Sequence, residues 1–169
     1  MDADRGPALA APSPLARARA DQVATLYASW PRTTASMLCG GALFCTAMWG
    51  QAPPALMAAW LALVVANQGW RRLLVRAWRR AHPGPSAMRR WGCYWSVGST
   101  AAGSLWGIAA ITMFPGSPAH QALSIVCLFG VVLGGLNLTA VYKPSFYGFV
   151  LAVLVPILGT TGRGSCIPN

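Results

Sequence analysis

The side chains that could do acid–base or metal chemistry are few in this sequence. It has three acidic residues, Asp2, Asp4 and Asp21, and it has no glutamate, so no carboxylate side chain occurs from Gln22 to Asn169. Paired-carboxylate catalysis, calcium or magnesium sites and di-iron sites all need carboxylates. We therefore predict that the protein is not an enzyme and has no catalytic, cofactor-binding or metal-binding residues.

Cysteine and histidine do not replace the missing acids. His82 precedes Pro83 rather than the acidic residue of a phosphoacceptor motif, and His120 lies far from it, so neither histidine is assigned a role. The cysteines include no CxxC pair, which favours small buried hydrophobic side chains over metal ligands or disulfides. They are Cys39, Cys45, Cys93, Cys127 and Cys166.

Arginine supplies most of the remaining charge, with 13 basic residues against 3 acidic ones. A basic segment after the second apolar run is a candidate for contacts with anionic lipid headgroups, each worth about 1 kcal/mol. These candidates are Arg71, Arg72, Arg76, Arg79, Arg80, Arg89 and Arg90. The other interpretation is a topology signal and helix extension with Trp70 and Trp78 at the interface. A nucleic-acid partner is not expected, because such a site needs a folded scaffold.

The elements that carry these residues are predicted to be transmembrane helices. Charged residues make up 9% of the chain and hydrophobic residues 55%, whereas a soluble domain carries roughly 25% charged residues. A spanning helix needs about 20 largely apolar residues. Five such spans are predicted within a transmembrane domain at 34–158, separated by a basic cytoplasmic loop at 69–91: 34–50, 52–68, 92–114, 120–141 and 145–158. Short connections rich in proline favour an all-α, multi-pass bundle of two helical hairpins plus one helix.

The positions of the basic residues predict the orientation. Cytoplasmic loops near spans are enriched in Lys and Arg. We predict a protein of the bacterial inner membrane with its N-terminus in the cytoplasm. Every basic residue except Arg163 then lies on the cytoplasmic side. An odd number of spans then places the C-terminus outside. If 145–158 does not span, the C-terminus is cytoplasmic.

The segments flanking the spans have different compositions. Residues 1–16 are rich in Pro and Ala, which predicts a disordered leader, and 159–169 form a polar tail. Residues 17–33 are predicted to form an amphipathic helix at the headgroup level, because helical spacing places four apolar residues on one face. These are Val23, Leu26, Tyr27 and Trp30. A cleaved signal peptide is disfavoured, since the apolar run begins too far from the start.

Small residues at four-residue spacing mark candidate packing faces in the third and fourth spans. They are Ser99, Gly103, Gly107, Gly130 and Gly134. Small residues let helix backbones approach closely in a bilayer. A homodimer contact is one interpretation, and packing within one chain, in the hairpin of these two spans, is favoured. Asn137 is the polar side chain in the fourth span that we would test, with an interhelical hydrogen bond as its expected role.

Several stretches resemble the N-terminal multi-span membrane domain of bacterial sensor proteins. They are DQVATLYASWP, WRRLLVRAWRR, RRWGCYWSVGSTAAGSLWGIAAITMFP and HQALSIVCLFGVVLGGLNLTAVYKPSFYGFVLAVLVPIL. In that family the membrane domain precedes a histidine kinase or a diguanylate cyclase/phosphodiesterase module. The resemblance implies a signal-transduction role and a sensor domain that can dimerise with a parent receptor. It carries over no catalytic residue.

The end of the chain departs from the family pattern, because GTTGRGSCIPN follows Leu158 where a further span and an output module are expected. The hypothesis is a reading frame truncated or shifted near Gly159, which sequencing the DNA beyond this point would test. Two alternatives remain open. One is a small transporter or channel subunit, for which Asn67, Asn137 and Thr100 are the polar residues, and the other is a non-functional product.

Overall fold

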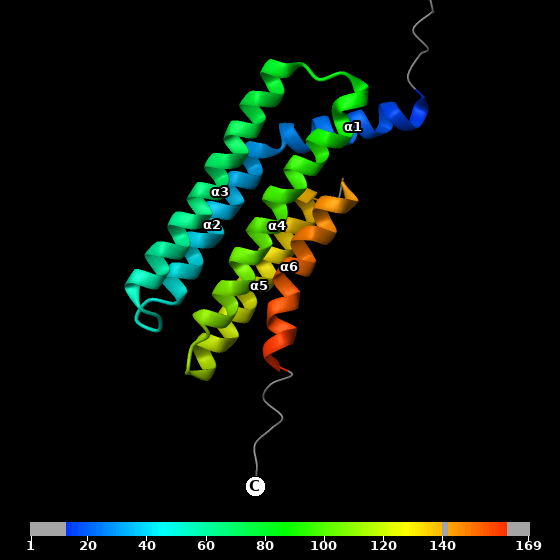
Figure 1. Cartoon of the computed structure of the whole chain (residues 1–169). Helices are drawn as coiled ribbons and strands as arrows, with labels where there is room; N and C mark the ends of the chain where they lie inside the picture. Colours follow the sequence, from blue (N-terminus) through cyan, green and yellow to red (C-terminus); the bar gives the residue numbers. More distant parts are fainter. Residues whose placement is uncertain (1–12, 140–141, 162–169) are drawn as a thin grey trace, which may run out of the picture.

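The computed structural model describes residues 13–139 and 142–161, and all regular structure in these ranges is helical (Figure 1). The helices are α1 (Pro14–Ala28), α2 (Trp30–Ala47), α3 (Pro54–Ala81), α4 (Met88–Thr112), α5 (Pro118–Thr139) and α6 (Lys143–Thr161), with a 3-10 turn, η1 (Pro85–Ala87), before α4. The prediction of an all-α fold is confirmed.

Proline and a few special backbone positions separate the helices. Helices α1, α2 and α3 each begin with proline in the first turn, where its missing N–H breaks no hydrogen bond. Ser13 caps α1, and its side chain accepts a hydrogen bond from the backbone N–H of Ala16 at 3.3 Å. Helix α3 ends at His82, whose φ of 40° places it in the left-handed region. These local signals explain the short connections.

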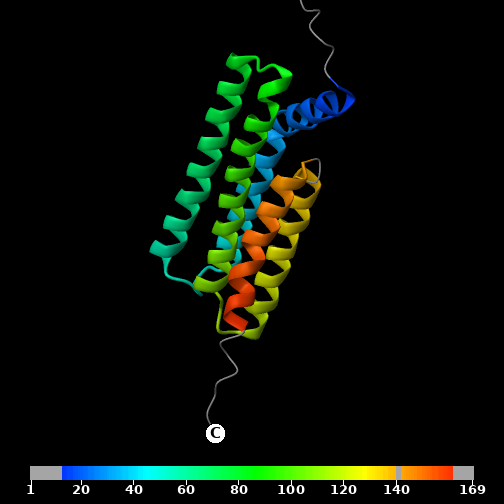
Figure 2. The same ribbon diagram turned by 45° about the vertical axis from the view of Figure 1, so that its right-hand side comes forward.

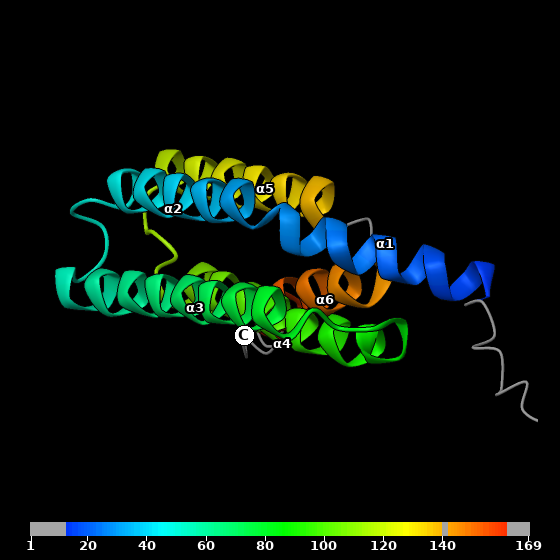
Figure 3. The same cartoon turned by 90° about the horizontal axis from the view of Figure 1, so that it is seen from above.

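The longer helices form two layers that run along a common direction. Helices α3, α4 and α6 lie on one side and α2 and α5 on the other, as the view from above shows (Figure 3). The most extensive contact joins α4 to α6, and α2 packs against α5 and α3. Helix α1 crosses one end of the bundle, next to the start of α4 (Figure 2).

The predicted pairing of spans is only partly what the structure shows. Helices α2 and α3 pack against each other as a hairpin. Helices α4 and α5 are joined by a short connection but make few contacts with each other. The small-residue face of α4 packs against α6, and α5 packs against α2. Adjacent helices in sequence are therefore not always the packing partners.

Two clusters of buried side chains hold the bundle together. The larger lies between the layers and contains Phe44, Trp60, Trp106 and Phe149. The rings of Trp60 and Trp106 meet edge to face with centroids 4.9 Å apart, a favourable aromatic geometry. The second cluster lies under α1 and joins it to the end of α3 and the start of α4.

The segments before and after the second span differ from their predictions. Residues 69–81 belong to α3, so the predicted loop at 69–91 is mostly helical. Of the four apolar residues predicted on one face of the N-terminal helix, Val23, Leu26 and Tyr27 are at most 1% exposed, whereas Trp30 begins α2 because α1 ends at Ala28. This face packs on α3 and α4 rather than facing headgroups, because their ends supply the apolar partners. The predicted disordered leader at 1–16 and polar tail at 159–169 are described only in part. Residues 14–16 belong to α1 and 159–161 to α6, whereas 1–12 and 162–169 lie outside the described residues.

Among the described residues, one helical window is long and apolar enough to cross a membrane, Pro118–Gly135 in α5, and only 11% of it is buried. A shorter apolar stretch covers Lys143–Val155 in α6. Helices α2 and α4 contain many Gly, Ser, Thr and Trp residues, which score low in hydropathy, and α3 carries several arginines. The apolar window in α5 is therefore weak evidence for membrane association.

Candidate functional site

The side chain of Arg71 lies in the interior between α3 and α4. It is 1% exposed, although it was predicted to contact lipid headgroups. Continuation of α3 beyond the predicted span explains this correction: Arg71 follows Val64 and Gln68 on the face that α3 turns inward. Its guanidinium donates a hydrogen bond from Nη2 to Ser99 Oγ at 2.9 Å.

Ser99 connects three helices at this point. Its hydroxyl donates to the carbonyl of Trp95 at 3.2 Å and accepts from Arg71. It also accepts from the hydroxyl of Ser145, on α6, at 2.7 Å. Both serines are fully buried. The hydrogen-bonding capacity of Ser99 is therefore used completely by α3, α4 and α6.

Two further polar side chains of α3 lie one turn before Arg71. Gln68 is 5% exposed, and its Oε1 accepts a hydrogen bond from Thr34 of α2 at 3.3 Å. Asn67 donates from Nδ2 to the carbonyl of Gly98 at 3.3 Å. These contacts extend the polar cluster from α6 across to α2.

The polar cluster has more donors than acceptors. Arg71 Nε and Nη1, Gln68 Nε2 and Trp95 Nε1 are buried and have no hydrogen-bond partner in the described part of the chain. The other buried atoms in this state are the indole nitrogens of Trp30, Trp78 and Trp106. All of them are N–H donors, so the interior lacks acceptors rather than donors.

The charge of Arg71 also lacks a carboxylate counterpart. Asp21 is the single acidic residue in the described ranges, and it is exposed on α1. The closest compensation is the ring of Trp95, whose centroid lies 5.0 Å from the guanidinium carbon. A cation over an indole face is worth about 2 kcal/mol when desolvated, well below the cost of burying an unpaired charge.

Aromatic side chains close the cluster on the side of α1. Tyr27 stacks on Trp78 with centroids 5.0 Å apart and lies the same distance from Trp95. Its hydroxyl donates to the carbonyl of Trp91 at 3.1 Å. Burial raises the pKa of the Tyr27 phenol above its ordinary value. Helix α1 therefore covers the end of the bundle that contains Arg71.

The other arginines predicted to contact headgroups are exposed. Arg90 donates from Nε to the hydroxyl of Tyr94 at 3.0 Å. All are at the end of the bundle where α3 ends and α4 begins, so headgroup contact stays a prediction for them. They are Arg72, Arg76, Arg79, Arg80, Arg89 and Arg90.

The predicted packing residues are divided between two kinds of surface. Ser99, Gly103 and Gly107 of α4 are buried, and a Cβ on Gly103 would clash with the carbonyl of Phe149 on α6. A Cβ on Gly134 would lie 3.5 Å from Ser36 of α2. Gly130 is exposed, and a Cβ on it would meet nothing within 4 Å in the described part of the chain.

Sequence reasoning did not single out Gln68 with Arg71 as a pair, nor Ser145. The three-residue spacing of Gln68 and Arg71 places both on one helix face, which is a signal present in the sequence. Ser145 carries no such signal, because its contact depends on α6 packing against α4. The side chain of Asn137 lies outside the described residues.

Fold and site together define a class, an all-α protein with a buried arginine at a junction of helices. No protein-family profile, curated protein or solved structure matches the chain.

Proposed function

We propose that the chain is a multi-span α-helical domain of a bacterial inner membrane, with its N-terminus in the cytoplasm, and that it serves as the sensor-type domain of a signal-transduction protein. It works by binding and conformational change rather than by catalysis. The observation that carries the membrane part is the apolar outer surface of the bundle.

Large hydrophobic side chains are exposed on all five long helices. In water this surface would be costly at about 25 cal/mol per Å², and soluble monomers rarely expose contiguous patches larger than a few hundred Å². The clearest examples, each at least half exposed, are Leu43, Leu63, Val65, Val97, Ile108, Val126, Phe129, Leu133, Leu151 and Val155. Lipid chains are the environment that suits them.

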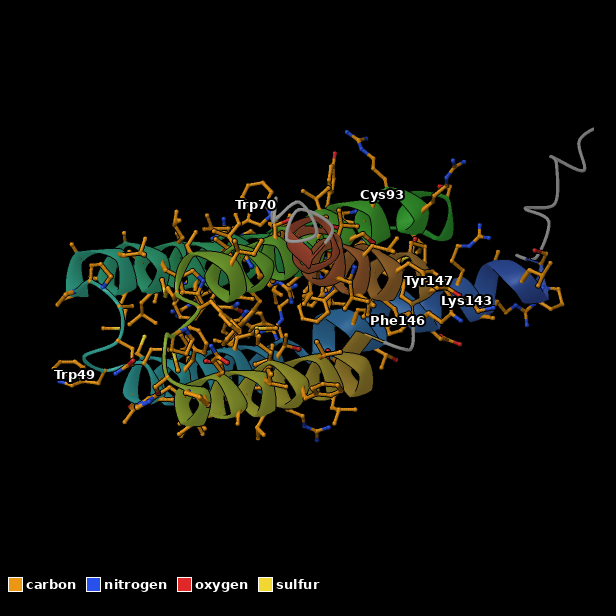
Figure 4. The ribbon with its side chains drawn as sticks, turned by 90° about the horizontal axis from the view of Figure 1, so that it is seen from below. Trp49, Trp70, Cys93, Lys143, Phe146 and Tyr147 are labelled. Carbon is orange, nitrogen blue, oxygen red and sulfur yellow. The ribbon has the colours of Figure 1, made fainter. Side chains whose placement is uncertain are left out.

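The ends of the bundle differ in charge, which supports the orientation. Helix α1, the end of α3 and the start of α4 lie together at one end, and the basic residues are concentrated there (Figure 1). Lys143 lies at this end too, with Phe146 and Tyr147 close to it, whereas Trp49 lies at the opposite end (Figure 4). Trp49 is 77% exposed and Tyr147 57% exposed, as expected for aromatic residues at the two interfaces.

The sensor role rests on the resemblance to bacterial sensor proteins and on the docking of α1. Helix α1 lies on the cytoplasmic side in this topology and packs against the aromatic side chains above Arg71. A change in the interior of the bundle would therefore reach α1 through direct contacts. The expected partners are anionic lipids, a second copy of the chain and a parent receptor, not nucleic acid.

Reporter fusions test the topology. A reporter active only in the periplasm should be active when fused after Gly116 and silent when fused after His82, because these connections lie at opposite ends of the bundle. The reverse pattern would overturn the orientation, and activity at neither site would overturn the multi-span arrangement. Coexpression with a sensor kinase or a cyclic-dinucleotide enzyme tests the role, since altered signalling is expected.

A second candidate is a small transporter or channel subunit. The observation that favours it is the buried polar cluster of Arg71, because polar side chains inside a membrane bundle often mark a solute path. Solute flux in proteoliposomes containing the purified chain would support this function. Flux without any effect on signalling would favour it over the sensor role.

A further inference from the structure

The buried donors around Arg71 suggest a ligand. Arg71 is 1% exposed, and its Nε and Nη1 have no hydrogen-bond partner in the described residues. Gln68, one turn earlier on the same face, is 5% exposed and presents its Nε2 in the same state. We propose that Arg71 and Gln68 form a binding site for a compact monovalent anion of about the size of chloride.

Charge supports an anion over a neutral ligand. The guanidinium is protonated at all physiological pH values. Asp21 is the sole carboxylate in the described ranges and lies exposed on α1. The hydroxyl of Ser99 is already occupied by its contacts with Arg71, Ser145 and the carbonyl of Trp95. An anion would both neutralise the buried charge and accept hydrogen bonds from the remaining N–H groups.

The local backbone supports a compact ligand. Gly98 of α4 faces Arg71, and a Cβ at this position would lie 3.4 Å from Nε. Glycine therefore leaves free the place beside Nε where an acceptor would sit. The ring of Trp95 under the guanidinium and the bond from Asn67 to the carbonyl of Gly98 restrict the surrounding space. A small ion fits these limits better than an extended organic acid.

Bromide quenching of tryptophan fluorescence tests the site, because Trp95 lies 5.0 Å from the guanidinium carbon. The full-length chain is purified in a non-ionic detergent without phospholipid and titrated with bromide, at constant ionic strength kept with gluconate. Exposed tryptophans such as Trp49 give quenching that rises linearly with bromide. We expect an additional saturable component that chloride abolishes and gluconate does not.

Variants assign this component to the site. The saturable component of quenching should be absent in Trp95→Phe. It should remain in Trp49→Phe, at a 77% exposed position. Gly98→Ala leaves Arg71 in place but covers Nε, and should weaken bromide binding severalfold, whereas Gly130→Ala should not. Gln68→Met should weaken binding about tenfold, as expected for loss of a hydrogen bond to a charged group.

The results that overturn the proposal are specific. Purely linear quenching in the wild-type protein overturns it, and so does a saturable component that survives in both Trp95→Phe and Gly98→Ala. The inference rests on the buried side chains alone. A failed reporter pattern would overturn the proposed topology without affecting bromide binding, and linear quenching would leave that topology intact.

Discussion

Arg71 and Arg72 show how one residue step along a helix changes the role of the same side chain. Arg72 lies on the exposed face of α3, whereas Arg71 is buried. A helix turns about 100° per residue, so neighbours in sequence face different surroundings. Burial of an arginine is costly unless its charge and its N–H groups find partners. Arg71 has the hydroxyl of Ser99 and the ring of Trp95 as partners, and its Nε and Nη1 have none among the described residues.

This contrast marks the limit of sequence reasoning at the residue scale. The seven arginines of 71–90 form one group by composition, and their charge predicts contacts with lipid headgroups for all of them. Helical phase from the apolar residues Val64 and Leu74 would have placed Arg71 inward. The hydrogen bond from Ser145 to Ser99 could not be predicted, because the two serines are 46 positions apart and no pattern in the sequence links α6 to α4.

Tyr27 provides a prediction at this scale. Tyr27→Phe removes the hydrogen bond from the phenol to the carbonyl of Trp91, so we expect the free energy of unfolding at neutral pH to fall by about 1 kcal/mol. Chemical denaturation of the purified chain in detergent measures this change. Tyr147→Phe is the control, since Tyr147 is 57% exposed, and its free energy of unfolding should stay unchanged.

The dependence of stability on alkaline pH gives a second prediction for Tyr27. Burial raises the pKa of its phenol in the folded state above the ordinary value, which is about 10. The folded state then holds the proton more tightly than the unfolded state. The contribution of the protonated phenol to the free energy of unfolding is fully present below pH 10 and declines as the pH rises above 10. Tyr27→Phe should reduce this decline, leaving the part due to Tyr142, whose pKa burial also raises. An identical decline in Tyr27→Phe would contradict the expectation.

At the scale of the elements, Gly103 sets the distance between α4 and α6. A Cβ here would clash with the backbone carbonyl of Phe149, which cannot rotate away as a side chain could. We expect Gly103→Ala to lower the free energy of unfolding by about 1–3 kcal/mol, the usual cost of overpacking. Thermal or chemical unfolding in detergent measures it.

Gly130→Ala is the matched control on α5, where a Cβ would meet nothing within 4 Å. Replacing glycine by alanine inside a helix stabilises it by about 0.5–1 kcal/mol when no clash results. The two variants should therefore change stability in opposite directions. Destabilisation by Gly130→Ala would instead indicate a contact of this face with a second chain.

Helix α1 is held by packing, which gives a further prediction at the scale of the elements. Leu26 is 1% exposed in the cluster that α1 shares with α3 and α4, and Leu26→Ala should cost about 2–5 kcal/mol. Arg17 and Arg19 of α1 are exposed but lie in helical backbone, and loss of the packing contact should let α1 unfold so that trypsin can cleave after them. Limited proteolysis followed by mass spectrometry measures the cleavage rate, which should rise. Leu15→Ala, at an 81% exposed position, should not change it.

Element boundaries followed from the sequence more closely than element partners did. Each predicted span overlaps one helix, because proline-rich connections such as 51–54 and 115–118 end helices wherever they occur. The partner of α4 was not predictable. Small residues at four-residue spacing show that a face permits close approach, but they do not specify which helix approaches. Ser99 and Gly103 lie against α6 because Ser145 donates a hydrogen bond to Ser99 and the backbone of Phe149 packs closely on Gly103.

At the scale of the whole molecule, a mostly apolar interior also contains a polar cluster, and large apolar side chains cover much of the outer surface. Gln68, Arg71, Ser99 and Ser145 are buried, while many Leu, Val and Ile side chains are exposed. In water, the hydrophobic effect opposes the exposure of so many large apolar side chains. In a bilayer, helices associate through small residues and hydrogen bonds rather than by burying apolar area. The distribution therefore supports the membrane part of the proposed function.

Phe129 on α5 allows this distribution to be tested. It is 65% exposed and lies within the apolar window Pro118–Gly135. If lipid covers this face, Phe129→Arg should cost about 2.5–3.5 kcal/mol of insertion and lower the fraction of chain that resists alkaline extraction from membranes. Leu15→Arg adds the same charge on α1, outside the spans, and should leave that fraction unchanged. If water covered the face instead, arginine would replace an exposed apolar ring and improve solubility. Equal extraction of Phe129→Arg and wild type would therefore contradict a lipid-facing α5.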